Sequence, residues 1–150
     1  MQFIIKVAIV FGTIAGMEAF SWFIHKYLFH GPLWFIHRSH HQHRQSGFEW
    51  NDVFSLLFAG IALYLMCQGR NGLDAKFWVG TGISIYGIIY FIFHDWFIHK
   101  RLKSFKTKNR YLMGISRAHK MHHKSIKKMP SEEFGLLLAS KKYFIQKKFS

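Results

Sequence analysis

Ten of the eleven histidines in this chain fall into four short clusters that repeat in a fixed order. A pair spaced HxxxxH is followed by a trio spaced HxxHH, and then both spacings recur. The members are His25 and His30, then His37, His40 and His41, then His94 and His99, and finally His119, His122 and His123. Imidazole is the commonest metal-ligating side chain and is largely neutral near pH 7. Ten imidazoles are too many for one ion, so the pattern predicts two neighbouring ions and chemistry with oxygen or water rather than a structural metal site.

The two spacings make different demands on the backbone. Successive residues of an α-helix are turned by about 100°, so positions i, i+3 and i+4 share one face. Both HxxHH clusters are therefore expected on helices, with their three imidazoles aimed at one point. Five residues give a turn of about 140° beyond a full circle. We therefore expect the second histidine of each HxxxxH pair to lie at a helix end or a bend.

A single HxxHH cluster could equally be a solvated polar helix face. The alternating recurrence of both spacings favours metal binding over that alternative. His43 lies outside the scheme, and we expect it to lie beside the ligands without binding metal.

Two carboxylates, Glu18 and Asp95, are candidate catalytic residues. Asp95 directly follows His94 and could orient that imidazole through its second nitrogen. Glu18 precedes His25 by seven residues, so it faces nearly the same way about 10 Å further along the helix, too far to bind the same ion. A carboxylate within a membrane span is costly and usually functional. We expect Glu18 to line a substrate cavity or tune an outer hydrogen-bond network, with a purely structural hydrogen bond as the alternative.

Three more polar residues, Glu49, Asn51 and Asp52, precede an apolar stretch. They could orient imidazoles in the same way as Asp95, or they could cap the helix that follows. For Asp52 we expect the cap.

Three apolar segments are long enough to cross a bilayer. The nineteen residues between Lys6 and Lys26 include one charged side chain and measure roughly 29 Å as a helix. Seventeen uncharged residues follow Asp52 and another seventeen precede His94, which is roughly 26 Å each and short but sufficient. Spanning segments must satisfy their own backbone hydrogen bonds, so the predicted fold class is an all-α polytopic membrane protein.

One shorter apolar stretch and several glycines also bear on how the spans are arranged. The apolar stretch 134–139 is too short to cross alone, and it either lies at the interface or plugs a gap among the helices, which leaves a fourth membrane element open. Gly12 and Gly16 form a GxxxG motif in the first span, and Gly80, Gly82 and Gly87 lie in the third. Small residues of this kind allow helices to approach closely.

Charge is concentrated near one end of the chain. Residues 100–150 hold 15 of the 21 lysines and arginines and only two acids. Basic segments are retained in the cytoplasm, so we expect one membrane-embedded domain, 1–150, with a cytoplasmic basic region from about residue 100. Three spans then bring all four histidine clusters to the cytoplasmic face. The basic region is expected to contact membrane lipid and an acidic protein partner, and not nucleic acid, because it is tied to a membrane.

Residues around the histidines carry a family resemblance. They include Gly16-Met17-Glu18, His25-Lys26-Tyr27, His37 to His41 as HxSHH, Phe48-Glu49, Tyr86-Gly87, His94-Asp95, Ala118-His119, Met121-His122-His123 and Phe134-Gly135. Over roughly residues 12 to 125, the chain resembles the bacterial β-carotene 3-hydroxylases of the fatty acid hydroxylase superfamily, which are membrane-bound di-iron enzymes.

That resemblance implies a reaction and its cofactors. O₂ and two electrons would insert a hydroxyl group at ring carbon 3 of β-carotene, first on one ring and then on the other, giving β-cryptoxanthin and zeaxanthin. It also implies two iron ions and electrons from a ferredoxin-type donor with its reductase. Imidazole by itself suits iron, zinc and copper alike, so the choice of iron rests on the resemblance.

Two alternatives stay open. The HxxHH spacing is shared with desaturases and other lipid hydroxylases, so a fatty acyl or sterol substrate is compatible with it. A metal transporter or a haem-carrying membrane protein fits less well. A transporter needs ligands near the bilayer midplane, and a bis-histidine haem would leave eight of the ten histidines unexplained.

Overall fold

The computed structural model describes residues 2–42, 47–103, 106–124, 128 and 132–145. These residues form helices and loops, with no strand among them. Three helical segments are long and apolar enough to cross a membrane, namely Phe3–Phe29, Asp52–Gly69 and Ala75–Ile98. The predicted all-α class and its three spans are therefore confirmed.

The first and third spans each consist of an α-helix continued by a wider π-helical turn. Helix α1 (Phe3–Ile24) runs into η1 (His25–Phe29), and α4 (Ala75–Tyr90) runs into η2 (Phe91–Ile98). Helix α3 (Asp52–Gly69) is the second span. A short connection joins α3 to α4, where the Asp74 side chain accepts hydrogen bonds from the backbone N–H groups of Lys76 and Phe77 and so caps α4.

Helix α4 packs against both other spans, and two of its glycines make this possible. A Cβ atom on Gly80 would lie 2.6 Å from the carbonyl oxygen of Ala62 in α3, and one on Gly82 would lie 2.6 Å from Cβ of Thr13 in α1. Close helix approach at these two positions is therefore confirmed. The GxxxG motif and Gly87 do not act in this way, because Gly12, Gly16 and Gly87 have no heavy atom of another element within 4 Å of the added Cβ.

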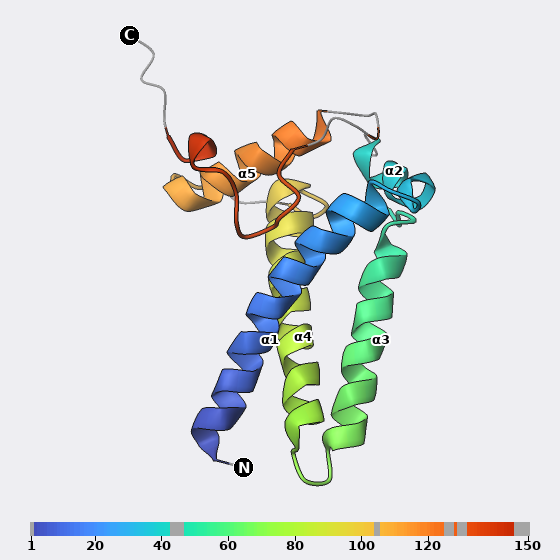
Figure 1. Ribbon diagram of the computed structural model, residues 1–150. Helices are drawn as coiled ribbons and strands as arrows, with labels where there is room; N and C mark the ends of the chain where they lie inside the picture. The colour runs from blue at the N-terminus through green and yellow to red at the C-terminus, as the bar shows by residue number, and fades with distance from the viewer. Residues whose placement is uncertain (1, 43–46, 104–105, 125–127, 129–131, 146–150) are drawn as a thin grey trace.

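Two shorter helices lie across one end of the spans. Helix α2 (Trp34–His41) follows α1, and α5 (Arg110–His123) follows α4 and η2. Figure 1 shows both at the end opposite the N-terminus. All four histidine clusters therefore gather at one end of the molecule, as the topology predicted.

The apolar stretch 134–139 folds back onto the bundle without forming a helix. Phe134 and Leu136 are buried there, and a short 3₁₀ turn, η3 (Lys141–Tyr143), follows. The segment therefore packs against the bundle through Phe134 and Leu136, whereas Leu138 is 74% exposed.

Candidate metal centre

The HxxxxH pairs lie where an α-helix widens into π-helical turns. In both, the second histidine donates its backbone N–H to the carbonyl of the first, His30 to His25 at 3.0 Å and His99 to His94 at 2.9 Å. An i+5 to i hydrogen bond stacks residues five apart above one another, as an α-helix does not. His30 and His99 each follow the last residue of the π-helical turn. The expected helix end is therefore confirmed, and the wider turn is what brings each pair onto one side.

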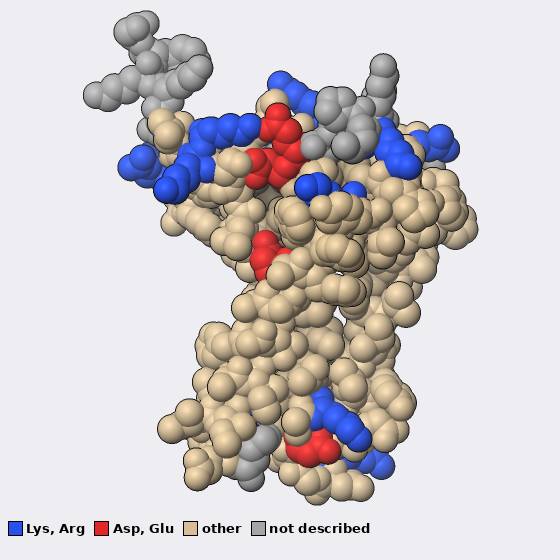
Figure 2. Space-filling view, in the orientation of Figure 1, with Lys and Arg blue, Asp and Glu red and all other residues tan. Residues whose placement is uncertain are grey.

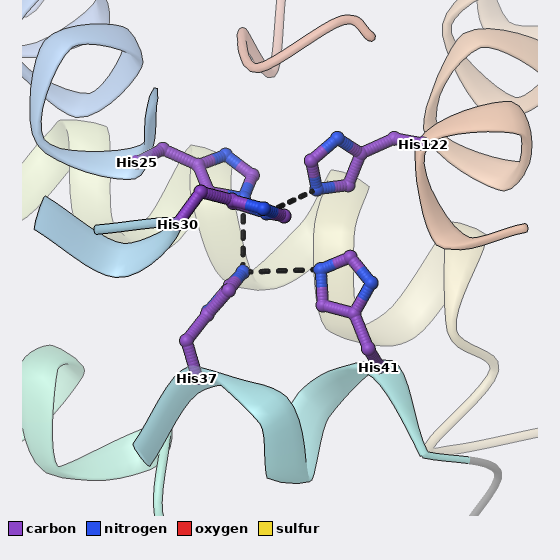
Figure 3. A group of neighbouring side chains, drawn as sticks. All are labelled: His25, His30, His37, His41 and His122. Atoms are coloured by element: carbon purple, nitrogen blue, oxygen red, sulfur yellow. Dashed lines mark hydrogen bonds between the residues drawn. The ribbon is translucent and has the colours of Figure 1, made fainter. Parts of the chain in front are cut away.

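Five imidazoles from three elements converge in the first histidine group. Their members are His25, His30, His37, His41 and His122, and one nitrogen of each lies within 4.8 Å of the others. Figure 3 shows them pointing at a common centre from η1 and the residue after it, from α2 and from α5. The Nε2 atoms of His25 and His37 are 3.0 Å apart, and those of His30 and His122 are 3.2 Å apart.

Four imidazoles form the second histidine group: His40, His94, His99 and His119. They come from α2, η2, the residue after η2, and α5. The Nε2 atoms of His40 and His94 are 3.0 Å apart, and those of His99 and His119 are 2.9 Å apart. The nine imidazoles of these two groups thus form two neighbouring sets, as two ions would require.

The HxxHH clusters are helical as predicted, but the expectation that each aims at one point is wrong. His37 and His41 belong to the first group, whereas His40 belongs to the second. Likewise His122 belongs to the first group and His119 to the second. Positions i+3 and i+4 differ by about 100° around a helix. Helices α2 and α5 therefore lie between the two groups, and each supplies imidazoles to both.

Most imidazoles of the first group are oriented by neutral hydrogen-bond acceptors that lie on the outer side of the group. The Nδ1 atoms of His25, His30 and His122 lie 2.8, 3.0 and 2.8 Å from the backbone carbonyl oxygens of Phe134, Lys128 and Glu132. Nδ1 of His37 lies 2.7 Å from Oδ1 of Asn51. A carbonyl oxygen can only accept a hydrogen bond, so Nδ1 donates and Nε2 keeps its lone pair for the centre.

The second group is oriented by carboxylates instead. Nδ1 of His40 lies 2.8 Å from Glu49 Oε2, and Nδ1 of His94 lies 2.9 Å from Asp95 Oδ1. Asp95 therefore has the geometry expected of it. A carboxylate behind an imidazole fixes its tautomer and raises its basicity toward a metal.

Arg101 joins these carboxylates. Its guanidinium donates to both oxygens of Asp52 at 2.9 Å and lies 3.5 Å from Glu49 and 3.7 Å from Asp95. Asp52 is the first residue of α3, and its side chain also accepts from the backbone N–H of Glu49. The expectation that Asp52 caps its own helix is therefore wrong, because its carboxylate is held by a bidentate pair with Arg101.

The geometry of both groups fits bound metal. An ion with Nε2 bonds of about 2.1 Å and ligands at right angles places neighbouring nitrogens about 3.0 Å apart, as observed in each group. Where Nδ1 donates outward on both partners, as in the pairs His25–His37 and His40–His94, the facing Nε2 atoms carry only lone pairs and cannot hydrogen-bond to one another. A cation between them removes that repulsion, so the residues present suit two metal ions.

Burial keeps these imidazoles ready to ligate. Desolvation is the largest cause in every case, and it lowers the pKa to about 4 for His99 and about 3 for His122. Burial also lowers the pKa of His30, His37, His40, His119 and His123. All seven are neutral at pH 7, the form that binds metal.

His123 is the tenth predicted ligand and belongs to neither group as the structure defines them. Its ring centroid lies 4.3 Å from that of His41 and 4.5 Å from that of His119. Its Nε2 atom is buried and has no hydrogen-bond partner among the described residues. Buried nitrogens normally have a hydrogen-bond partner, and one that binds metal needs none. His123 therefore remains a predicted ligand. His43 lies outside the described residues.

A cavity of about 510 Å³ opens beneath both groups. Residues of α1, α3 and α4 form its walls, chiefly apolar side chains such as Phe20, Phe54 and Met66. His25 and His37 of the first group and His94 and His119 of the second also line it. An apolar chamber inside the spans thus ends on both candidate metal positions.

The expectation that Glu18 lines this cavity is not met, although its neighbours Met17, Phe20 and Ser21 do line it. The buried Glu18 carboxylate instead accepts hydrogen bonds from the Tyr86 hydroxyl and from the backbone of the C-terminal segment.

Two residues near the site were missed from the sequence. Tyr90 places its hydroxyl 3.2 Å from Nε2 of His94 and lines the cavity. Its spacing of four residues from His94 could have indicated this, because i and i+4 share a helix face. No local pattern indicates Arg101, since Asp52, the partner of its bidentate pair, lies 49 positions earlier in the sequence.

The outer carboxylates give a direct prediction. Asp95→Asn should weaken metal binding at the second group by about 10-fold to 100-fold, because an amide supports His94 with less charge than a carboxylate. Metal affinity measured by competition with a chelator checks this, with Asp74→Asn, a change from carboxylate to amide at the other end of the third span, as the control. Unchanged affinity in Asp95→Asn would mean that the hydrogen bond to His94 does not influence the metal.

Comparisons with known proteins agree with this geometry. Residues 10–141 match the family model "Fatty acid hydroxylase". The chain is 37% identical to a protein of Pantoea ananas named "Beta-carotene hydroxylase", over 93% of this chain and 80% of that one. It is 33% identical to a Paracoccus protein of the same name, over 87% and 82% of the two chains. It is also 37% identical to the Arabidopsis thaliana "Beta-carotene 3-hydroxylase 1, chloroplastic", over 89% of this chain and 44% of that one. No solved structure matches the chain. Two grouped sets of histidines at one end of three membrane-length helices, together with a family match over most of the chain, show that this protein belongs to the fatty acid hydroxylase family.

Proposed function

We propose that this protein hydroxylates ring carbon 3 of β-carotene, giving β-cryptoxanthin and then zeaxanthin. The observation that carries the proposal is the apolar cavity within the spans that ends on both histidine groups. A hydrocarbon substrate dissolved in the bilayer can reach such a cavity without crossing water. Relatives named as β-carotene hydroxylases match over most of the chain and support the same substrate.

Two iron ions are proposed, one in each histidine group. When bound, they would supply activation of O₂, so that one oxygen atom enters a C–H bond and two electrons and two protons reduce the other to water. The protein's own residues would hold these ions and orient the substrate. His25 and His37 face the cavity from one group, and His94 and His119 face it from the other. The substrate ring would therefore lie against both.

The remaining cavity residues exclude water and position the ring. Phe29 and Phe54 stack at 4.1 Å between centroids and present flat apolar surface to the chamber. The Tyr90 hydroxyl oxygen lies 3.2 Å from Nε2 of His94 at the edge of the chamber. A ring without polar atoms forms no hydrogen bonds here, so shape decides which carbon faces the metal positions.

The test is expression in cells that accumulate β-carotene, followed by pigment chromatography. We expect β-cryptoxanthin and zeaxanthin to replace β-carotene, and the same cells carrying His94→Ala to retain it. Unchanged carotenoids together with newly hydroxylated fatty acids or sterols would assign the enzyme to another lipid substrate.

For the orientation, we propose that the histidine end faces the cytoplasm. Figure 2 shows many lysines and arginines at the end that carries α5, with a largely uncharged surface between the two ends. Basic residues are retained in the cytoplasm. The same surface suits an acidic ferredoxin-type electron donor, which we propose as the partner together with its reductase. Anionic lipid is the other contact that this charge favours.

Cys67 tests this orientation, because it is the single cysteine of the chain. It is exposed near the end of α3 that lies opposite the histidines. A membrane-impermeant maleimide should therefore label it in intact cells. Labelling that requires access to the inner face would reverse the orientation, and a Cys67→Ser variant controls for other reactive groups.

A further inference from the structure

Glu18 is a buried carboxylate in the first span that does not itself line the cavity, although two of its four hydrogen-bond partners, Tyr86 and Leu136, do. Its Oε1 atom accepts from the backbone N–H groups of Leu136, Leu137 and Leu138 at 3.0, 2.8 and 3.2 Å. Its Oε2 atom accepts from the Tyr86 hydroxyl at 2.8 Å. One side chain of α1 thus holds three successive residues that lie more than a hundred positions later in the sequence.

These bonds let an irregular loop enter the bundle. Backbone donors without a helix are tolerated inside a membrane protein only when other protein groups satisfy them. Three successive N–H groups around one oxygen form a concavity that suits an anion. Gly135 leaves room for this turn, because a Cβ atom there would lie 2.7 Å from the Leu138 carbonyl oxygen and 3.2 Å from Oε1 of Glu18. Residues 132–138, here called the 132–138 loop, are therefore shaped around the carboxylate.

The same loop reaches the first histidine group. The carbonyl of Phe134 accepts from Nδ1 of His25, and the carbonyl of Glu132 accepts from Nδ1 of His122. The Phe134 ring packs edge-on against both imidazoles, with centroids 5.5 and 5.2 Å away. The two histidines come from η1 and α5. The loop therefore ties together imidazoles from separate elements, whereas side-chain carboxylates orient His40 and His94 in the second group.

We propose that Glu18 is a positioning residue for the first histidine group and acts through the 132–138 loop. The proposal rests on the metal binding proposed above. The negative charge strengthens the three backbone hydrogen bonds, which hold the carbonyls of Phe134 and Glu132 against His25 and His122. Without that anchor these two imidazoles lose their fixed orientation, while the second group keeps its own carboxylate partners.

Metal content in two backgrounds separates the groups. In His94→Ala the ion that remains should occupy the first group, and in His122→Ala it should occupy the second. We expect Glu18→Gln, which keeps an oxygen but removes the charge, to lower metal affinity about 10-fold or more in the His94→Ala background. The same change should leave affinity in the His122→Ala background unaltered. Gly135→Ala should give the same selective loss, because it displaces the loop and leaves Glu18 in place.

Asp74→Asn is the matched control, since it changes a carboxylate to an amide at the far end of α4 and should alter neither affinity. Equal loss from both backgrounds would show that Glu18 supports only the general fold, and no loss in either would show that the loop does not position the histidines. Both results overturn the proposal. If Glu18→Gln does not fold, Gly135→Ala decides between the same outcomes. A wild-type protein without bound metal would instead overturn the proposed function.

Discussion

Replacing His94 by alanine should remove one bound metal ion and lower β-carotene turnover by about a thousandfold or more. His94 faces the cavity and lies 3.0 Å from His40 between their Nε2 atoms. A metal ion contributes several kcal/mol to a reaction of this kind, and each 1.4 kcal/mol or so is a factor of ten in rate. Metal analysis of the purified protein and pigment chromatography of the cells measure the two effects.

The first histidine group should respond in the same way. His37→Ala removes a ligand that shares α2 with His40 but serves the other group, so it should also cost one ion and most of the activity. His43→Ala is the control from the same region of sequence and should retain most activity. If His43 proved essential for activity while His37 or His94 could be replaced without loss, the predicted set of metal ligands would be wrong.

Filling the cavity should give the second largest effect. Ala59 lies on α3, lines the cavity and is exposed, so a larger side chain can be placed there without displacing the helix core. Ala59→Trp should lower conversion of β-carotene at least about tenfold, because the indole takes space that the substrate needs, whereas both metal ions should be retained. Chromatography together with metal analysis separates this outcome from a folding defect.

Leu57→Trp on the same helix is the matched control, since Leu57 is 56% exposed and is not among the cavity-lining residues. It adds a similar bulk toward lipid and should leave conversion nearly unchanged. Equal loss in both variants would indicate a general effect on α3. Full activity in Ala59→Trp would place the substrate elsewhere.

Much of the architecture could be read from local sequence. Spans depend on the apolar content of consecutive residues, so hydropathy placed Phe3–Phe29, Asp52–Gly69 and Ala75–Ile98 nearly correctly. Three spans also place the two ends of the chain on opposite sides of the membrane and all four histidine clusters on one side. The number of spans was therefore enough to predict both. The link between Asp95 and His94 was predictable for the same reason, because adjacent residues meet whatever the fold.

Contacts between distant segments could not be read in this way. Helix spacing showed that His37, His40 and His41 share a face, but only the packing of η1, η2 and α5 around α2 divides them between two groups. Arg101 reaches Asp52 across 49 positions, and Glu18 reaches Leu136 across 118.

The sequence by itself therefore determined the spans, the clustering of the histidines and most of the expected ligands, because hydropathy and helix periodicity act over a few residues. Only the tertiary structure decided which imidazoles lie together in one group and which acceptors orient them. It also decided that the Glu18 carboxylate faces a loop rather than the cavity. A buried polar group must find its partner wherever packing supplies one, and that partner is a property of the assembled fold.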